Sequence, residues 1–168
     1  MYARILVALD GSPLAEQILP HVEALGKAFG SQVTLVRATE PPGRLINQTA
    51  GVAPIGVPGN PVVDITPLIE EQRREAATYL RSTTDRLRGK GLTVESAQPE
   101  GLPADMVLQH ARETGADLIA MTTHGRGGLG RLVFGSVADA VLRQALCPVL
   151  LVRVQEEHPA EAEQRRLP

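Results

Sequence analysis

The sequence predicts an α/β protein built on a parallel sheet with helices on both faces. The alternation of two apolar patterns supports this fold class, and length and composition indicate one globular domain. Short apolar runs of strand length alternate with longer stretches in which apolar residues recur every three or four positions, as in successive βαβ units. The chain has 168 residues, enough for one domain with a substantial core. Hydrophobic residues make up 43% and charged residues 21%, which is typical of a globular domain rather than a disordered chain.

The first βαβ unit is predicted from three consecutive patterns. Residues 3–9 are apolar and rich in branched side chains, as expected of a strand buried on both faces. Pro13 favours a helix start, and residues 15–29 then place apolar side chains along one face until Gly30 ends the helix. Residues 32–38 form the second strand, which must run parallel to the first with a right-handed crossover.

Residues 40–67 interrupt this alternation. The segment is rich in proline and glycine, shows little periodicity and is longer than an ordinary connection. We expect a mobile flap over a ligand site, and a plain insertion is the alternative that the composition leaves open.

The second half of the chain returns to the alternating pattern. Helices are predicted at 69–87, 101–113 and 137–145, and strands at 92–98, 117–123 and 149–154. The charged residues 155–168 lack apolar periodicity, so they predict a disordered tail after a single domain of residues 1–154.

Composition argues against several classes of function. The net charge of −2 and the few aromatic residues offer neither a basic surface nor a stacking platform for nucleic acid. Cys147 is the single cysteine, which excludes an intrachain disulfide, and we expect it to be a small core residue. We also expect a cytoplasmic protein without a membrane partner, because we find no signal peptide and no apolar run of roughly 18 residues.

A glycine-rich stretch between the fourth strand and the last helix carries the strongest functional signal. Four glycines fall within residues 125–130, and Gly135 and Ser136 stand at the start of the helix. Glycines allow backbone amides to turn toward an anion, and a helix start adds unpaired amides and a positive dipole end. The stretch therefore predicts a phosphate-binding loop.

Two common phosphate-binding motifs fit this stretch poorly. Gly125-x-Gly127-x-x-Gly130 matches the dinucleotide fingerprint, but the helix begins too late and the acidic residue about 20 positions on is missing. A P-loop requires Gly-Lys-Ser/Thr, and the only two lysines, Lys27 and Lys90, lie in other contexts.

The spacing that fits is Thr122-x2-Gly125-x9-Gly135-Ser136, which resembles the universal stress protein family. Nucleotide-binding members of that family carry Gly-x2-Gly-x9-Gly-Ser/Thr, so Thr122 stands at the family's first glycine. The resemblance extends from residues 5–12 to residues 147–152. It implies an open five-stranded Rossmann-like sheet of order 3-2-1-4-5, adenine nucleotide binding, and a homodimer formed through the last strand.

The predicted site combines phosphate and nucleoside contacts. Backbone amides of Gly125, Gly135 and Ser136, with the Ser136 hydroxyl, would hold the phosphates; Ser136 could also cap the helix in a box with Asp139. Asp10 could accept from a ribose hydroxyl or help bind Mg²⁺, or simply form a turn.

The remaining predicted site residues line the nucleoside pocket or lie beside the phosphates. The resemblance implies that Ala38 and Gly101 contact adenine through backbone groups. Arg126 could neutralise phosphate charge or be solvated, and His124 is expected to stabilise a turn rather than act as a base. The full predicted binding set is Ala8, Leu9, Asp10, Ala38, Gly101, Met121, Thr122, Thr123, His124, Gly125, Arg126, Gly128, Gly135, Ser136 and Val137.

Three functions remain open from the sequence. The leading one is an ATP-binding stress-response regulator, in which ATP and Mg²⁺ control conformation and binding of a protein partner, with slow or no hydrolysis. The second is a nucleotide-free dimeric module of the same fold. The third is an adenylyl-transferring or ATP-cleaving enzyme, for which only Asp10 and His124 offer reactive groups.

Overall fold

The structure is a computed structural model that describes residues 1–41, 66–124 and 135–154. The flap predicted over residues 40–67 lies outside the described residues except at its two ends. The predicted tail, residues 155–168, and the glycine run of residues 125–130 also lie outside them.

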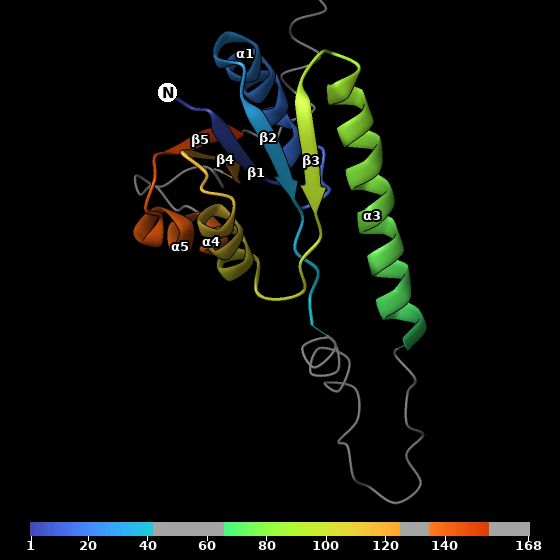
Figure 1. The fold of residues 1–168 in the computed structure, drawn as a ribbon. Coiled ribbons are helices and arrows are strands. Elements are labelled where there is room, and N and C mark those ends of the chain that lie inside the picture. Colours follow the sequence, from blue (N-terminus) through green and yellow to red (C-terminus); the bar gives the residue numbers. More distant parts are fainter. Residues whose placement is uncertain (42–65, 125–134, 155–168) are drawn as a thin grey trace, which may run out of the picture.

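The described residues form one sheet of five parallel strands in the order β3-β2-β1-β4-β5 (Figure 1). The strands are β1 Arg4–Ala8, β2 Gln32–Val36, β3 Thr93–Ala97, β4 Leu118–His124 and β5 Val149–Val154. In the middle of the sheet, Val7 of β1 is level with Leu35 of β2 on one side and Ala120 of β4 on the other. The predicted fold class and strand order are confirmed.

The helices cover both faces of the sheet. The helical segments are η1 Ala15–Ile18, α1 Leu19–Phe29, α3 Thr66–Arg88, α4 Pro103–Glu113 and α5 Ser136–Gln144. Side chains of α1 and α3 share one core cluster with the sheet, and side chains of α4 and α5 share the other. In Figure 1, α3 lies on one side of the sheet and α4 and α5 lie on the other.

The central strand β1 shows why this arrangement is stable. Ile5 and Val7 pack into the cluster beneath α1 and α3, and Leu6 between them packs into the cluster beneath α4 and α5. All three are 1% exposed or less. Burying an aliphatic side chain of this size contributes about 1.5–3 kcal/mol, so a strand that is apolar on both sides belongs in the middle of the sheet.

The first helical stretch differs from the predicted single helix. It begins as a 3₁₀ turn, Ala15–Ile18, and becomes α-helical only at Leu19. Pro20 occupies the first turn of α1, where its missing amide hydrogen is tolerated because that amide would have no helical partner. The proline therefore marks the point at which the α-helix starts.

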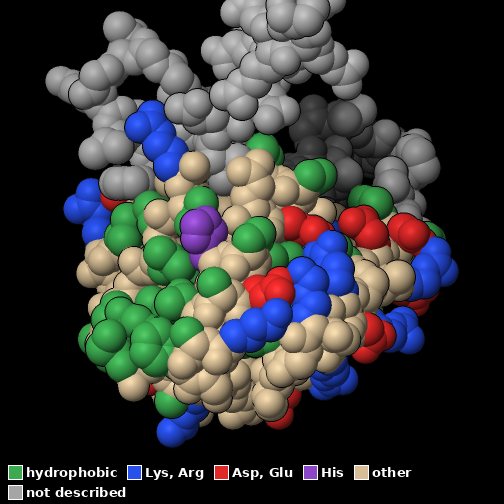
Figure 2. All heavy atoms as spheres, turned by 90° about the horizontal axis from the view of Figure 1, so that it is seen from above, with side chains coloured by type: hydrophobic (Ala, Val, Ile, Leu, Met, Phe, Trp, Pro, Cys, Tyr) green, Lys and Arg blue, Asp and Glu red, His purple; other side chains and the backbone are tan. Residues whose placement is uncertain are grey.

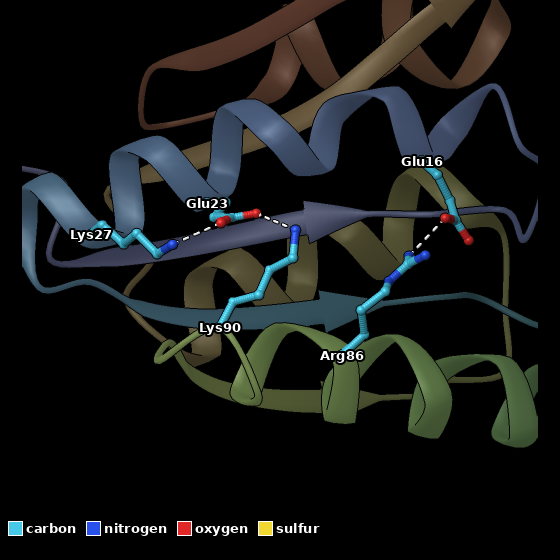
Figure 3. Close-up of polar contacts among 5 residues, drawn as sticks. All are labelled: Glu16, Glu23, Lys27, Arg86 and Lys90. Atoms are coloured by element: carbon cyan, nitrogen blue, oxygen red, sulfur yellow. Dashed lines mark hydrogen bonds and ion pairs between the residues drawn. The ribbon is translucent and has the colours of Figure 1, made fainter.

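Ion pairs connect η1 and α1 with the carboxyl end of α3 and the turn after it (Figure 3). Arg86 Nη2 lies 2.7 Å from Glu16 Oε2, and Lys90 Nζ lies 2.5 Å from Glu23 Oε2. Lys27 also pairs with Glu23, and hydrogen bonds from Lys27 and Lys90 lower the pKa of that carboxylate. Such exposed pairs contribute little individually, and they link side chains of η1 and α1 to the end of α3.

Charges of both signs are intermixed on the surface seen in Figure 2, where Lys and Arg side chains lie beside Asp and Glu side chains. Their fields therefore largely cancel at a distance. Within the described residues, no helix is both long and apolar enough to cross a bilayer.

Candidate functional site

A cavity of about 260 Å³ opens at the carboxyl ends of β1 and β4. The chain runs outward from β1 to β3 on one side and from β4 to β5 on the other, so this is the topological switch point at which parallel α/β sheets bind ligands. The described lining residues are Ala8, Leu9, Asp10, Ala15, Val36, Ala38, Pro103, Val107, Met121, Thr122, Thr123, Gly135, Ser136, Val137 and Ala138.

The turn after β1 places Asp10 at the mouth of this cavity. Asp10 Oδ1 accepts a hydrogen bond of 2.7 Å from the Ser12 amide, and Ser12 Oγ accepts one of 3.1 Å from the Ala15 amide. Gly11 between them has φ +89°, a conformation that glycine adopts without strain. Asp10 is thus a turn-forming residue, as one interpretation of the sequence proposed, and its second oxygen accepts no hydrogen bond within the described residues.

Arg37 lies directly behind this turn, although sequence reasoning did not single it out. Its guanidinium carbon lies 5.3 Å from the centroid of the Tyr79 ring, and its Nη2 donates to Glu75 Oε1 at 3.1 Å. Tyr79 and Glu75 belong to α3, so Arg37 joins that helix to the end of β2. A side chain added at Gly11 would meet the same guanidinium at 2.7 Å.

The start of α5 forms the opposite rim. Gly135 is the N-cap residue, with φ −58° and ψ 155°, and the first helical hydrogen bond runs from the Asp139 amide to the Gly135 carbonyl at 3.0 Å. Within the part of the chain that the structure describes, no side chain caps this end. The predicted capping box between Ser136 and Asp139 is therefore wrong, because Ser136 is already the first helical residue and Asp139 bonds Arg143 instead. The first amides of α5 are left without an acceptor within the helix.

Strand β4 supplies the wall between these two rims. Met121 is 5% exposed and packs in the cluster beneath α4 and α5, whereas half-buried Thr122 follows it on the strand. Because alternate side chains of a strand point to opposite faces, the Thr122 side chain faces away from that cluster. The cavity remains open with Thr122 in its wall.

The structure brings together most of the predicted residues that it describes. The predicted residues that line the cavity are Ala8, Leu9, Asp10, Ala38, Met121, Thr122, Thr123, Gly135, Ser136 and Val137. Gly101 is not among the lining residues: its amide donates to the Thr39 carbonyl at 3.0 Å beside the cavity. His124 ends β4, and Gly125, Arg126 and Gly128 lie outside the described residues.

Sequence reasoning missed five lining residues: Ala15, Val36, Pro103, Val107 and Ala138. They share one property, which is that each belongs to an apolar helix or strand pattern and reads as core. Val107 and Ala138 lie on the buried faces of α4 and α5. The signal that could have found Ala15, Pro103 and Ala138 is their position in the first turns of helical segments that start near the switch point. Val36 ends β2 and Val107 lies one turn into α4, so that signal does not extend to them.

Among residues 1–41, 66–124 and 135–154, no three His, Cys, Asp or Glu side chains gather into a metal-binding group. Asp10 is the one carboxylate in the described lining. A single carboxylate suits a Mg²⁺ ion that is otherwise held by phosphate oxygens and water, rather than a metal enclosed by protein ligands.

Comparison with known proteins agrees with this geometry. Residues 1–153 match the profile of the Universal stress protein family. A universal stress protein of Thermus aquaticus is 33% identical over 156 residues, covering 91% of this chain and 100% of that protein. The solved structure of hypothetical protein MJ0577 of Methanocaldococcus jannaschii has a TM-score of 0.73 at 25% identity, over 94% of this chain and 99% of that chain. The universal stress protein from Archaeoglobus fulgidus in complex with dAMP shares the fold, with a TM-score of 0.63 at 24% identity, over 90% of this chain and 98% of that chain.

Proposed function

Because this chain belongs to the universal stress protein family, we propose that it is a regulatory protein that binds ATP or another adenine nucleotide in the cavity between β1 and β4. The observation that carries the proposal is the meeting of two separate chain segments at the switch point. The turn after β1 presents a carboxylate, and the start of α5 presents uncapped amides, across one cavity.

The phosphates would lie at the start of α5. A helix of nine residues with no side-chain cap offers its first amides and the positive end of its dipole to an anion. The Ser136 hydroxyl stands in the same first turn and lines the cavity. An acidic side chain nearby would repel phosphate, but Asp139 is engaged by Arg143 at 2.9 Å.

The nucleoside would occupy the apolar part of the cavity. Ala8, Val36 and Ala38 line it from β1 and β2, Val107 from α4 and Met121 from β4. These side chains suit a flat, weakly polar base, and the Archaeoglobus fulgidus protein of the same fold was solved with an adenine nucleotide.

Mg²⁺ would accompany the phosphates. The second oxygen of Asp10 would supply one ligand from the protein. The ion would also neutralise phosphate charge, because the described lining contains no Lys or Arg to do so.

We propose slow or no hydrolysis. Among the described lining residues Asp10 is the one titratable group, and it is partly occupied by its own turn. Rapid phosphoryl transfer requires a group that orients water and a cation that stabilises the leaving phosphate. Nucleotide binding would then act through the difference in its affinity for two conformations of the protein, which present different surfaces to a partner protein.

The direct test is calorimetric titration of the purified protein with ATP, ADP, AMP, adenosine and GTP in the presence of Mg²⁺, with release of phosphate and AMP followed in the same samples. We expect binding of the adenine series and product release much slower than nucleotide exchange. Absence of binding would favour the nucleotide-free module, and rapid multiple turnover would favour the enzyme.

We also propose that two copies pair along β5. This strand is the outer edge of the described sheet, and Val149, Leu150, Leu151 and Val152 are only half-buried. An apolar edge strand is a template for pairing with another chain. Sedimentation velocity should give a dimer at micromolar concentration, and a monomer there would contradict this part of the proposal.

A further inference from the structure

The side chain of Thr123 is buried in the cavity wall without a hydrogen-bond partner among the described residues. Thr123 is 5% exposed, and its buried Oγ1 atom makes no hydrogen bond within that part of the chain. It lines the cavity between β1 and β4. Nearly all buried hydroxyls in native proteins are paired, because an unpaired one loses its bonds to water without replacement.

The surroundings of Thr123 explain why it lacks a partner. On β4, Ile119 and Met121 face the cluster beneath α4 and α5, so by alternation Thr123 faces the same side. The cavity residues on that side are apolar, among them Val107 and Ala138. Among the described lining residues, Thr123 therefore carries the one buried polar side chain.

We propose that the Thr123 hydroxyl is the hydrogen-bond partner of the nucleoside part of the ligand, a ribose hydroxyl or a polar atom of the base, and so helps determine which ligand is bound. This inference rests on the proposed nucleotide-binding function. The phosphates belong at the exposed rim formed by Gly135 and Ser136, whereas Thr123 is a buried residue of the cavity wall. A neutral hydroxyl both donates and accepts, which suits an uncharged sugar or base.

The unpaired Thr123 hydroxyl should lower the stability of the free protein and raise the stability of the complex. Replacing the hydroxyl by a methyl group of the same shape should stabilise the ligand-free protein and weaken the complex. A hydroxyl with a purely structural role would give the opposite effect on the free protein, so the two roles separate by sign.

The experiment compares Thr123→Val, which deletes the hydroxyl, with Thr123→Ser, which keeps it. The matched control is Thr84→Val, because Thr84 of α3 is 4% exposed, has an equally unpaired Oγ1 and does not line the cavity. Melting temperature without ligand and calorimetric affinity for adenosine and for ATP are measured for each protein.

We expect Thr123→Val to raise the Tm of the free protein by about 2–4 °C and to weaken binding of adenosine and ATP alike by about tenfold. Thr123→Ser should keep most of the affinity. Thr84→Val should raise Tm similarly and leave both affinities unchanged.

Unchanged affinity in Thr123→Val, or a lower Tm or failure to fold, would overturn the proposal while leaving nucleotide binding in place. A loss of ATP affinity without a loss of adenosine affinity would assign the hydroxyl to phosphate and also overturn it. If the wild-type protein bound none of the nucleotides, the proposed function itself would fail, and this inference with it.

Discussion

The carboxylate of Asp139 accepts a hydrogen bond from Arg143 Nε at 2.9 Å, one turn further along α5. This pair lowers the pKa of Asp139 through the hydrogen bond from Arg143, so the carboxylate stays charged at neutral pH. It also places a positive charge beside the only acidic side chain in the first turn of α5. The charge of Asp139 at the helix start is thereby balanced by the neighbouring guanidinium.

Arg143→Gln should weaken binding of ATP by about two- to threefold at low salt, because the unbalanced Asp139 charge would repel the phosphates across a few ångströms. Binding of uncharged adenosine should not change. Titrations of both ligands at low and high salt check this. Arg81→Gln, which removes an exposed arginine from α3, is the matched control; an equal loss in that variant would trace the effect to net charge alone.

Gly135→Val should abolish detectable nucleotide binding while the fold remains intact. Gly135 has φ −58°, which any residue adopts, and a Cβ added there would meet no atom of the described residues within 4 Å. The new side chain would instead occupy space at the rim where phosphates are proposed to lie. Circular dichroism and Tm should match the wild type, and a Gly135→Val protein that still bound ATP would exclude the rim as the phosphate site.

The fold was predictable because buried residues recur in the sequence at the period of a strand or a helix. The apolar run around Val7 is typical of a strand buried on both faces, and the later strands follow similar apolar runs. The strand order came from family resemblance instead. It depends on Val7 lying beside Ala120, a pairing across more than half of the chain that no local pattern records.

The candidate site was predictable at its loops but only in part at its walls, where Ala8, Leu9 and Met121 were predicted through the family resemblance. Asp10 and Gly135 stand out because a turn and a helix start require special residues. Val107 and Ala138 do not, because an apolar residue facing a cavity and one facing the core have the same sequence signal. The apolar periodicity of residues 15–29 did not predict the exposure of Phe29, which ends α1, is 44% exposed and meets Tyr2 ring edge to face.

Gly11→Ala should destabilise the protein more than Gly30→Ala, because the two glycines share a positive φ but differ in their surroundings. Gly30, with φ +63°, ends α1 and has nothing within 4 Å of an added Cβ, so alanine there should cost about 1 kcal/mol. Gly11 has φ +89°, and its Cβ would also meet Arg37 Cζ at 2.7 Å, so we expect about 2–3 kcal/mol.

Urea unfolding of both variants measures this difference. Arg37→Met in the Gly11→Ala background should recover the part of the stability loss that is due to contact with the guanidinium. The part that is due to the positive φ should remain, and a double-mutant cycle separates the two parts. Equal costs for the two alanine variants would show that the guanidinium simply moves aside.

The phenol of Tyr79 should make the free energy of unfolding depend on pH between about 10 and 12. Burial, and then the nearby Glu16 carboxylate, raise the pKa of Tyr79 from 10.0 to about 12. Across this window the unfolded chain has released the phenolic proton and the native protein still holds it. The unfolded state then binds fewer protons, so stability is complete below pH 10 and falls as pH rises, by about 2 kcal/mol at most.

Urea unfolding at several alkaline pH values tests this, with Tyr79→Phe as the control because it keeps the ring beneath Arg37 but has no proton to lose. The difference in stability between wild type and Tyr79→Phe should shift in favour of the variant as pH rises from 10 to 12, while pH effects from other groups cancel. A constant difference over that range would mean that the Tyr79 phenol has the same pKa in the folded and the unfolded chain. The packing of the Tyr79 ring against Arg37 would then not shield the hydroxyl from water.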